Sequence, residues 1–382
     1  MRTSTRAVLA TLLGALALAS TTSVAPSLPV GPPAPTFQGN AAHTGASPES
    51  FDPPLRLRWR RSLPGKVFFP VVADERVFVV SNERARMRLY AFDTNTGRRL
   101  WLRTLSGDAW STIGYGSGRL FAVTENCTVL ALDPATGGTR WAAKNFAIEY
   151  SCTAPPAIRN GVVFIVSGAA GGALTARNAT TGRFLWRRAT GTAEFEPAIA
   201  STDRVFTSGL IDVRAFGYDG TRLWATACCG QPPSGGTAAF YRGRLYVRYG
   251  AGVLDAASGK VVDALASETA FAFADQQALR IAAGDLQAVN LATGEPVWTY
   301  SASADIELPP LVVHGVAYVG ARDGSLTAVR LSDGQQVWTT QAPAAFSGSE
   351  VVHEYVGFAA ANGILAVPAE NQLVLYEPVP TP

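Results

Sequence analysis

The sequence predicts an all-β protein: an eight-bladed β-propeller made of four-stranded antiparallel blades. Three observations predict this fold, namely a motif that recurs along most of the chain, short strand-like segments between its copies, and a lone strand near each end. Hydrophobic residues make up 47% of the 382 residues and charged residues only 16%, so the chain can build a packed core and is not intrinsically disordered.

The recurring motif reads Ala-x-Asp-x-x-Thr-Gly-x-x-x-Trp, with complete copies from Ala91 to Trp101 and from Ala131 to Trp141. The Asp side chain can accept hydrogen bonds from backbone N–H groups two or three residues later, and Gly tolerates positive φ, so the middle of the motif is a tight turn. The Trp lies on an outer strand, where its flat ring can seal one blade against the next. We interpret the repeat tryptophans as structural: Trp59, Trp101, Trp141, Trp186, Trp224, Trp298 and Trp338.

The motif glycines recur at steps of 35 to 45 residues, which is the length of one propeller blade. The segments between them, such as Arg76–Val80, are β-branched or aromatic and bounded by turn residues. The copy from Val253 to Asp263 keeps its glycine but has Asp263 where Trp is expected, so blade five should have the weakest outer seal. The glycines are Gly97, Gly137, Gly182, Gly220, Gly259, Gly294 and Gly334.

Seven motifs predict eight blades because the two ends of the chain supply the last one. The segment Leu373–Glu377 occupies the motif's strand position but has no outer strand after it, and Leu55–Arg60 is an outer strand with no blade before it. Pairing them closes the ring and removes both exposed sheet edges. We therefore assign 55–377 to the propeller, 20–54 to an N-terminal lead-in segment and 378–382 to a tail.

The first residues have the pattern of a signal peptide. Arg2 and Arg6 precede the apolar run 7–19, which is too short to span a bilayer, and Ala17-Leu18-Ala19 is a cleavage site, with Ala25 as the alternative end. We expect an exported protein, secreted or kept at the cell envelope, without a membrane span and monomeric. Its net charge of +3, or +1 without the two arginines, gives no electrostatic footprint for nucleic acid.

Four cysteines in an exported chain predict disulfides, with three possible connectivities. Cys127 falls in the turn between the second and third strands of blade two, and Cys152 in the connection leading into blade three. Because those two kinds of turn share one face of a propeller, we pair Cys127 with Cys152. Cys228 would then pair with Cys229 or remain reduced.

The connections between blades carry many carboxylates and aromatic side chains, which could ring one mouth of the central channel and bind a cation, a cofactor or a peptide. The alternative is that each is a solvated loop residue. We expect the partner, a protein, a peptide or a small molecule, at this face of the channel. The residues concerned are Trp110, Glu149, Tyr150, Phe195, Glu196, Phe271, Glu307, Glu350 and His353.

The repeat resembles that of the quinoprotein propellers, a superfamily that includes enzymes carrying pyrroloquinoline quinone (PQQ) and a non-catalytic outer-membrane assembly lipoprotein, which is closest in size. The run Phe37–Gly45 and the later Trp59 are similar to the lead-in of that superfamily. The resemblance is specific for the fold and weakly specific for activity.

One feature resembles the enzymes, which hold their quinone against a ring of two adjacent cysteines. Cys228 and Cys229 are such a pair, and Trp110 and Phe195 are aromatic candidates to flank a quinone. The acidic residue and the Asn-Arg-Gly that follow the pair in the enzymes are missing, and neither catalytic residues nor metal ligands can be assigned. The sequence therefore favours a non-catalytic binding or scaffold propeller; the alternative is a small PQQ-dependent oxidoreductase that also binds calcium.

Overall fold

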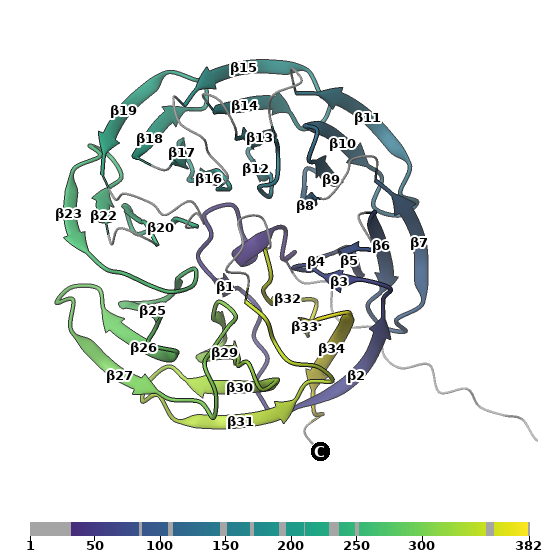
Figure 1. Ribbon diagram of the computed structural model, residues 1–382, viewed down its shortest axis with the longest axis vertical. Coiled ribbons are helices and arrows are strands. Elements are labelled where there is room, and N and C mark those ends of the chain that lie inside the picture. The colour runs from purple at the N-terminus through teal and green to yellow at the C-terminus, as the bar shows by residue number, and fades with distance from the viewer. Residues whose placement is uncertain are drawn as a thin grey trace, which may run out of the picture.

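The computed structural model describes residues 32–83, 86–105, 110–145, 151–168, 172–190, 196–209, 211–228, 237–248, 252–348 and 355–380. Eight sheets are arranged in a ring around a central axis, so the predicted eight-bladed propeller is confirmed (Figure 1). Within each blade, successive strands pair antiparallel from the centre outward. The described residues contain one short 3-10 helix, η1 (Phe37–Gly39), and no helix among them is long and apolar enough to cross a membrane.

The first four blades follow one another along the chain, each beginning at its inner strand. Blade one also carries the short strand β3, which pairs with β5 beside the inner strand β4. The strands are β3 (Lys66–Val67), β4 (Val71–Ala73), β5 (Arg76–Asn82), β6 (Met87–Asp93) and β7 (Arg99–Thr104) in blade one; β8 (Ser111–Gly116), β9 (Arg119–Thr124), β10 (Thr128–Leu132) and β11 (Thr139–Lys144) in blade two; β12 (Ala157–Arg159), β13 (Val162–Ser167), β14 (Ala173–Asn178) and β15 (Phe184–Ala189) in blade three; and β16 (Ile199–Ala200), β17 (Arg204–Ser208), β18 (Asp212–Gly217) and β19 (Arg222–Ala227) in blade four.

The other four blades complete the ring, and the last one takes its outer strand from the N-terminal part of the chain. The strands are β20 (Ala239–Tyr241), β21 (Arg244–Tyr246), β22 (Gly252–Asp255) and β23 (Val261–Ala264) in blade five; β24 (Ala272–Ala274), β25 (Gln277–Ala282), β26 (Asp285–Asn290) and β27 (Pro296–Tyr300) in blade six; β28 (Leu311–Val313), β29 (Val316–Gly320), β30 (Ser325–Arg330) and β31 (Gln336–Gln341) in blade seven; and β32 (Ala359–Ala361), β33 (Ile364–Ala369), β34 (Gln372–Pro378) and β2 (Leu55–Ser62) in blade eight.

Ring closure by the two ends of the chain is confirmed. Strand β2 pairs antiparallel with β34 along its length, with Trp59 opposite Leu375 (Figure 1). The pairing begins at Leu55, the predicted first residue of the propeller, and reaches Pro378, one residue beyond the predicted end. Blade eight is therefore built from segments more than 300 residues apart in the sequence.

The motif forms the turn that its residues predict. In blade one, Asp93 Oδ1 accepts hydrogen bonds from the backbone N–H groups of Asn95 (3.0 Å) and Thr96 (2.8 Å), and Gly97 has φ +65°. A Cβ at Gly97 would lie 2.6 Å from the ring of Trp59 on the preceding outer strand. Gly is required here both for the positive φ and for the close approach of the indole.

The repeat tryptophans seal neighbouring blades in one common way. Six of the seven repeat indoles lie against the motif glycine of the next blade and donate their Nε1–H to a backbone carbonyl of that turn, whereas Trp338 packs against Tyr376 of blade eight. The bonds are Trp59 to Thr94 (2.8 Å), Trp101 to Pro134 (3.0 Å), Trp141 to Ala179 (3.1 Å), Trp186 to Tyr218 (2.6 Å), Trp224 to Ala256 (3.1 Å) and Trp298 to Leu331 (2.8 Å).

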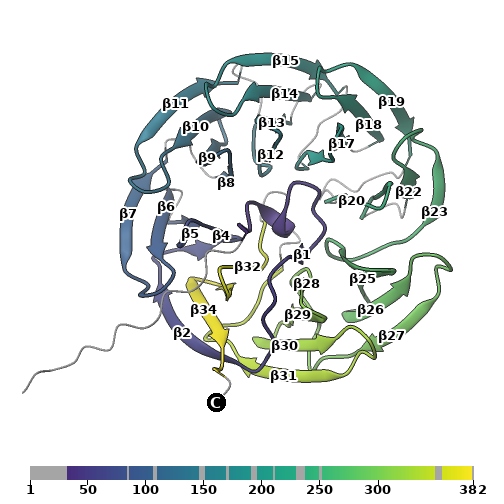
Figure 2. The same cartoon turned by 180° about the vertical axis from the view of Figure 1, so that it is seen from behind.

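Residues 34–49, which we call the inner segment, line the centre of the ring (Figure 2). This segment contains η1 and β1 (Ala46–Ser47), and β1 pairs parallel with the inner strand β28. It contacts all eight blades in their order around the ring. The contacts are Ala34 with Val72, Pro35 O with Tyr115 N, Thr36 Oγ1 with Pro156 O, Ala41 O with Ala200 N, Ala42 O with Phe240 N, Thr44 O with Phe273 N, Gly45 O with Val312 N, and Ser47 Oγ with Ala360 O.

Candidate functional site

One face of the propeller is formed by the connections between blades and by the turns between the second and third strands of each blade; we call it the connection face. Several of the sequence-predicted site residues on this face are described, namely Trp110, Glu196, Cys228, Phe271 and Glu307. The others lie outside the described residues: Glu149, Tyr150, Phe195, Cys229, Glu350 and His353.

Glu196, at the entry to blade four, belongs to a polar group that we call the central cluster, made of the buried residues Glu196, Thr237 and Tyr355 and the partly buried Arg248. Burial raises the pKa of Glu196 to about 7, opposed by the charge of Arg248 and by a hydrogen bond that the Thr237 hydroxyl donates to the carboxylate. Burial also raises the pKa of Tyr355. The charge of Glu196 adds to this increase, and the charge of Arg248 opposes it. The entries to blades four, five and eight, with the turn between the second and third strands of blade five, thus bring these groups together.

The inner segment lies directly beneath Tyr355. The ring of Phe37 meets the rings of Tyr355 at 5.2 Å and Phe69 at 5.6 Å, both edge-on, and the ring of His43 at 6.5 Å. His43 Nδ1 lies 3.2 Å from the carbonyl oxygen of Ala238, the residue after Thr237. Burial lowers the pKa of His43 to about 4, although this hydrogen bond opposes the shift, so the ring is neutral near pH 7.

Three buried polar atoms in this region have no hydrogen-bond partner among the described residues. They are Gln38 Oε1, His43 Nε2 and Glu196 Oε2. Buried polar groups are normally paired, so atoms of this kind mark a place where water or a ligand completes the bonding. The centre of the ring can therefore accept hydrogen bonds from a bound molecule.

The remaining described residues of the predicted ring have other partners. Trp110 packs against Phe68, with ring centroids 6.1 Å apart. Phe271 is fully buried between blades five and six, where it contacts Tyr246. Glu307 accepts hydrogen bonds from the Arg322 guanidinium (2.6 Å) and the backbone N–H of Gly348 (3.2 Å). Among the described residues of the predicted ring, Glu196 therefore belongs to the central cluster, whereas Trp110, Phe271 and Glu307 do not.

The partners of Glu196 at the centre carry no recognisable signal in the sequence. These partners are Thr237, Arg248 and Tyr355. They lie in separate connections and turns without a shared motif, and only the fold brings them near Glu196. His43 lies within the run Phe37–Gly45. The resemblance of this run to a family lead-in was the one sequence feature that pointed to His43.

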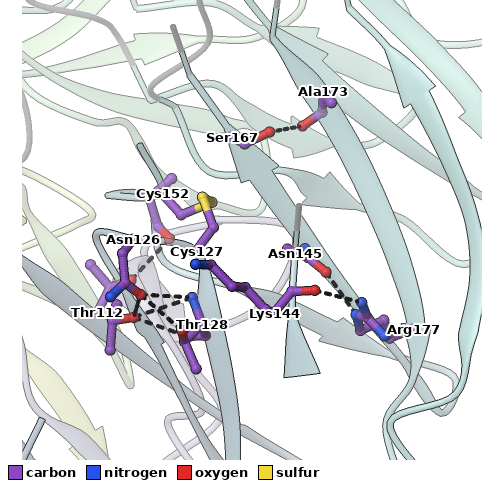
Figure 3. The surroundings of a disulfide bond; sticks show 12 residues. Thr112, Asn126, Cys127, Thr128, Lys144, Asn145, Cys152, Ser167, Ala173 and Arg177 are labelled. Carbon is purple, nitrogen blue, oxygen red and sulfur yellow. Dashed lines mark hydrogen bonds between the residues drawn. A yellow bond between two sulfur atoms is a disulfide. The ribbon is translucent and has the colours of Figure 1, made fainter. Parts of the chain in front are cut away.

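The structure contains the predicted disulfide between Cys127 and Cys152, with Cα atoms 4.9 Å apart. Both cysteines are fully buried, and the bridge joins the turn of blade two to the entry of blade three. The backbone N–H of Asn145 donates to Cys127 O (2.8 Å), and its side-chain oxygen accepts a bond from Arg177 Nε (2.7 Å) (Figure 3). The connection between these blades is therefore tied both covalently and by hydrogen bonds.

Cys228 follows β19 and is disulfide-bonded, packing beside Trp224 and Phe240. A calcium ion that supports PQQ needs several oxygen ligands beside the cofactor. Within the described part of the chain, no group of three or more His, Cys, Asp or Glu side chains converges to hold a metal. The described residues alone therefore supply no calcium ligand set for a quinone.

Three solved structures illustrate what the fold is similar to. The quinohemoprotein alcohol dehydrogenase of Comamonas testosteroni has a TM-score of 0.73 and 15% identity, covering 92% of this chain and 82% of that one. BamB of Moraxella catarrhalis has a TM-score of 0.65 and 16% identity, covering 85% and 98%. A europium-containing methanol dehydrogenase has a TM-score of 0.64 and 15% identity, covering 82% and 87%. At these identities the likeness concerns the fold alone.

No curated protein sequence matches the chain. A family model described as outer membrane protein assembly factor BamB matches residues 54–111, 86–211 and 211–375. These ranges run from the closing strand β2 to the last strand β34 and so cover the whole ring. The chain belongs to this family of propellers with PQQ-type repeats, described by its model as outer membrane protein assembly factor BamB.

Proposed function

We propose that the protein is an exported binding propeller without a catalytic role, which holds a polypeptide partner on its connection face. The observation that carries the proposal is the central cluster with its neighbours in the inner segment. A buried carboxyl, a guanidinium and a phenol converge there, beside buried oxygen and nitrogen atoms that have no partner among the described residues.

The chemistry of the cluster suits the amides and side chains of a polypeptide. A carboxyl with a pKa of about 7 accepts hydrogen bonds in either protonation state and donates one when protonated. Gln38 Oε1 adds a second acceptor, and Arg248, which donates a hydrogen bond to the carbonyl oxygen of Glu268, adds a positive charge beside the cluster. The family description, an assembly factor of outer membrane proteins, agrees with a polypeptide as the partner.

Export is part of the proposal. The signal-peptide pattern lies within residues 1–31, outside the described residues, and remains a prediction. The buried disulfide between Cys127 and Cys152 supports export because such bonds persist in oxidising compartments.

Native mass spectrometry of the protein purified from its own host tests the proposal. We expect a polypeptide adduct that is reduced in Glu196→Gln and unchanged in Arg183→Gln, an exposed position on a turn of the opposite face. An adduct with the mass of a quinone and a calcium ion would contradict the proposal, as would a polypeptide adduct equally reduced in both variants.

The alternative is a small PQQ-dependent oxidoreductase, and the disulfide-bonded Cys228 is the observation that favours it. In that case Cys228 and Cys229, with Trp110 and Phe195, would face the quinone. Titration of the pure protein with PQQ and calcium, followed by quinone absorbance and dye-linked alcohol oxidation, separates the two functions. We expect no saturable binding; saturable binding with turnover that is lost in Cys228→Ser would establish the enzyme.

A further inference from the structure

Blade five lacks the indole that seals the other junctions. Asp263 pairs with Val253 in the register that places the Trp of the other motif copies opposite an Ala, for example Trp298 opposite Ala288. The register shift after this pair is also the same. Asp263 therefore occupies the Trp position of a normally built strand. The indole side chain is missing there, but the backbone is not rearranged.

The space that an indole would fill remains open. A Cβ at Gly294, the motif glycine of blade six, would meet nothing within 4 Å, whereas at Gly334 it would lie 2.7 Å from the ring of Trp298. A pocket that is open to solvent lies between β23 and the turn after β26. Blades five and six thus have a cavity where other junctions have a side chain.

The walls of this pocket match those around the repeat indoles. Leu291 and Gly294 hold the positions that Leu331 and Gly334 hold around Trp298, and the carbonyl of Leu331 accepts the indole N–H at 2.8 Å. Apolar contacts come from Val253, Leu265 and Val289. Arg244 and Asp263 also line the pocket and place one charge of each sign at its wall.

We propose that this pocket, which we call the indole socket, is a binding site for the indole ring of a ligand. The bound ring lies against Gly294, fills the place of the missing repeat Trp, and donates its N–H to the carbonyl of Leu291. The source of the ring is either a tryptophan in a partner polypeptide or a free indole compound, since the two share this chemistry. The socket lies on the outer rim of the ring, away from the central cluster, so it stands independently of the proposed function.

Titration of labelled protein with free indole and with the tripeptide Gly-Trp-Gly, followed by nuclear magnetic resonance, tests the proposal. We expect saturable shifts at the amides of Leu291, Gly294 and Tyr246. N-methylindole, which cannot donate a hydrogen bond, should bind about tenfold more weakly than indole, the equivalent of one lost hydrogen bond. Tighter binding of the tripeptide identifies a polypeptide as the source, and tighter binding of indole identifies a small molecule.

The variant Asp263→Trp, alone or with Val253→Ala to restore the usual Ala–Trp pair, should fill the socket and abolish these shifts. Asp263→Asn keeps the socket open and should bind as the wild type does, which provides the matched control. The proposal is overturned if indole causes no saturable shift in the wild type, or if the shifts persist unchanged when the introduced Trp is folded into the junction.

Discussion

At the residue scale, the buried groups at the centre of the ring titrate in opposite directions. The pKa of His43 is lowered to about 4 and that of Glu196 is raised to about 7. Burial disfavours the charged form in both cases, so each group is held neutral over part of the range between pH 4 and 7. Each shift links the stability of the fold to pH, with opposite sign.

The His43→Gln variant isolates one of these effects. Below pH 6.5 the unfolded chain protonates His43 and the folded chain does not, so the wild type loses stability as pH falls from 6.5 toward 4. The stability of the variant relative to wild type should therefore improve by up to about 1.4 kcal/mol for each pH unit in this window. Urea unfolding at several pH values measures the difference; a pH-independent difference would mean that His43 titrates normally.

The Glu196→Gln variant should show the reverse trend. Between pH 4.5 and 7 the folded chain keeps its proton on Glu196 while the unfolded chain releases it, so the wild type loses stability as pH rises through this window. Relative to wild type, the variant should gain stability as pH increases from 4.5 to 7. The same unfolding series serves as the measurement, and a gain as pH falls would contradict the neutral state inferred for Glu196.

At the element scale, the seals between blades explain why one motif recurs around the ring. Six of the seven repeat indoles fill the space above a motif glycine and donate to a backbone carbonyl of the neighbouring turn, as Trp298 does with Gly334 and Leu331. The junction after blade five lacks this contact, and all four residues of β23 are exposed. A Trp introduced at the junction after blade five should therefore be tolerated, whereas removal of the Trp at the junction after blade six should destabilise the fold.

We expect Asp263→Trp to be neutral or to stabilise the fold by about 0.5–2 kcal/mol, because it restores the repeat residue at a site with open space. Trp298→Ala, at the equivalent position of the next blade, should cost about 3–5 kcal/mol because it leaves a cavity. Thermal unfolding compares the two. A large loss of stability in Asp263→Trp would show that Asp263 has a specific role of its own.

The disulfide between Cys127 and Cys152 closes a loop of 25 residues between two neighbouring blades. Its removal in the double variant Cys127→Ser/Cys152→Ser should cost about 3–4 kcal/mol in the loop-entropy model. Denaturant unfolding measures the loss. Non-reducing peptide mapping of the wild type should recover the two cysteines in one linked pair, and recovery of both as alkylated thiols without reduction would refute the bridge.

At the scale of the whole molecule, the inner segment contacts all eight blades. A substitution within it should therefore lower the stability of several blades at once. Gly45 has φ +59°, and a Cβ there would lie 2.6 Å from the Cβ of Ala272 in blade six. Gly118 also has a positive φ, +67°, but a Cβ there would meet nothing within 4 Å. The two positions therefore share the backbone strain of a substitution and differ in the steric clash.

Gly45→Ala should lower the free energy of unfolding by about 1–3 kcal/mol more than the control Gly118→Ala, which is the usual cost of overpacking. Hydrogen exchange should also accelerate at the backbone amides of Phe273 and Val312, which donate to the inner segment next to Gly45. Equal effects of the two substitutions would show that the inner segment is not tightly packed against the blades.

The sequence predicts the ring far better than the site. The motif glycines, the indoles and the unpaired strands at Leu55 and Leu373 are local patterns, so blade number and closure could be inferred from them. The contacts of the inner segment were missed because backbone bonds such as that between Ala41 and Ala200 leave no residue pattern. The central cluster was missed for a related reason: Glu196 comes near Thr237 and Tyr355 only because blades four, five and eight face one centre.

The central claim is that a polypeptide binds to the connection face, and paired photo-crosslinking tests it most directly. A photoreactive amino acid is placed at Ser303, exposed in the connection between blades six and seven, or at Arg183, exposed in a turn on the opposite face and away from the indole socket. After irradiation in the native host, we expect a discrete polypeptide adduct at position 303 that is reduced by Glu196→Gln, and no such adduct at 183. Equal crosslinking at both positions, or an adduct at 183 alone, would contradict the account.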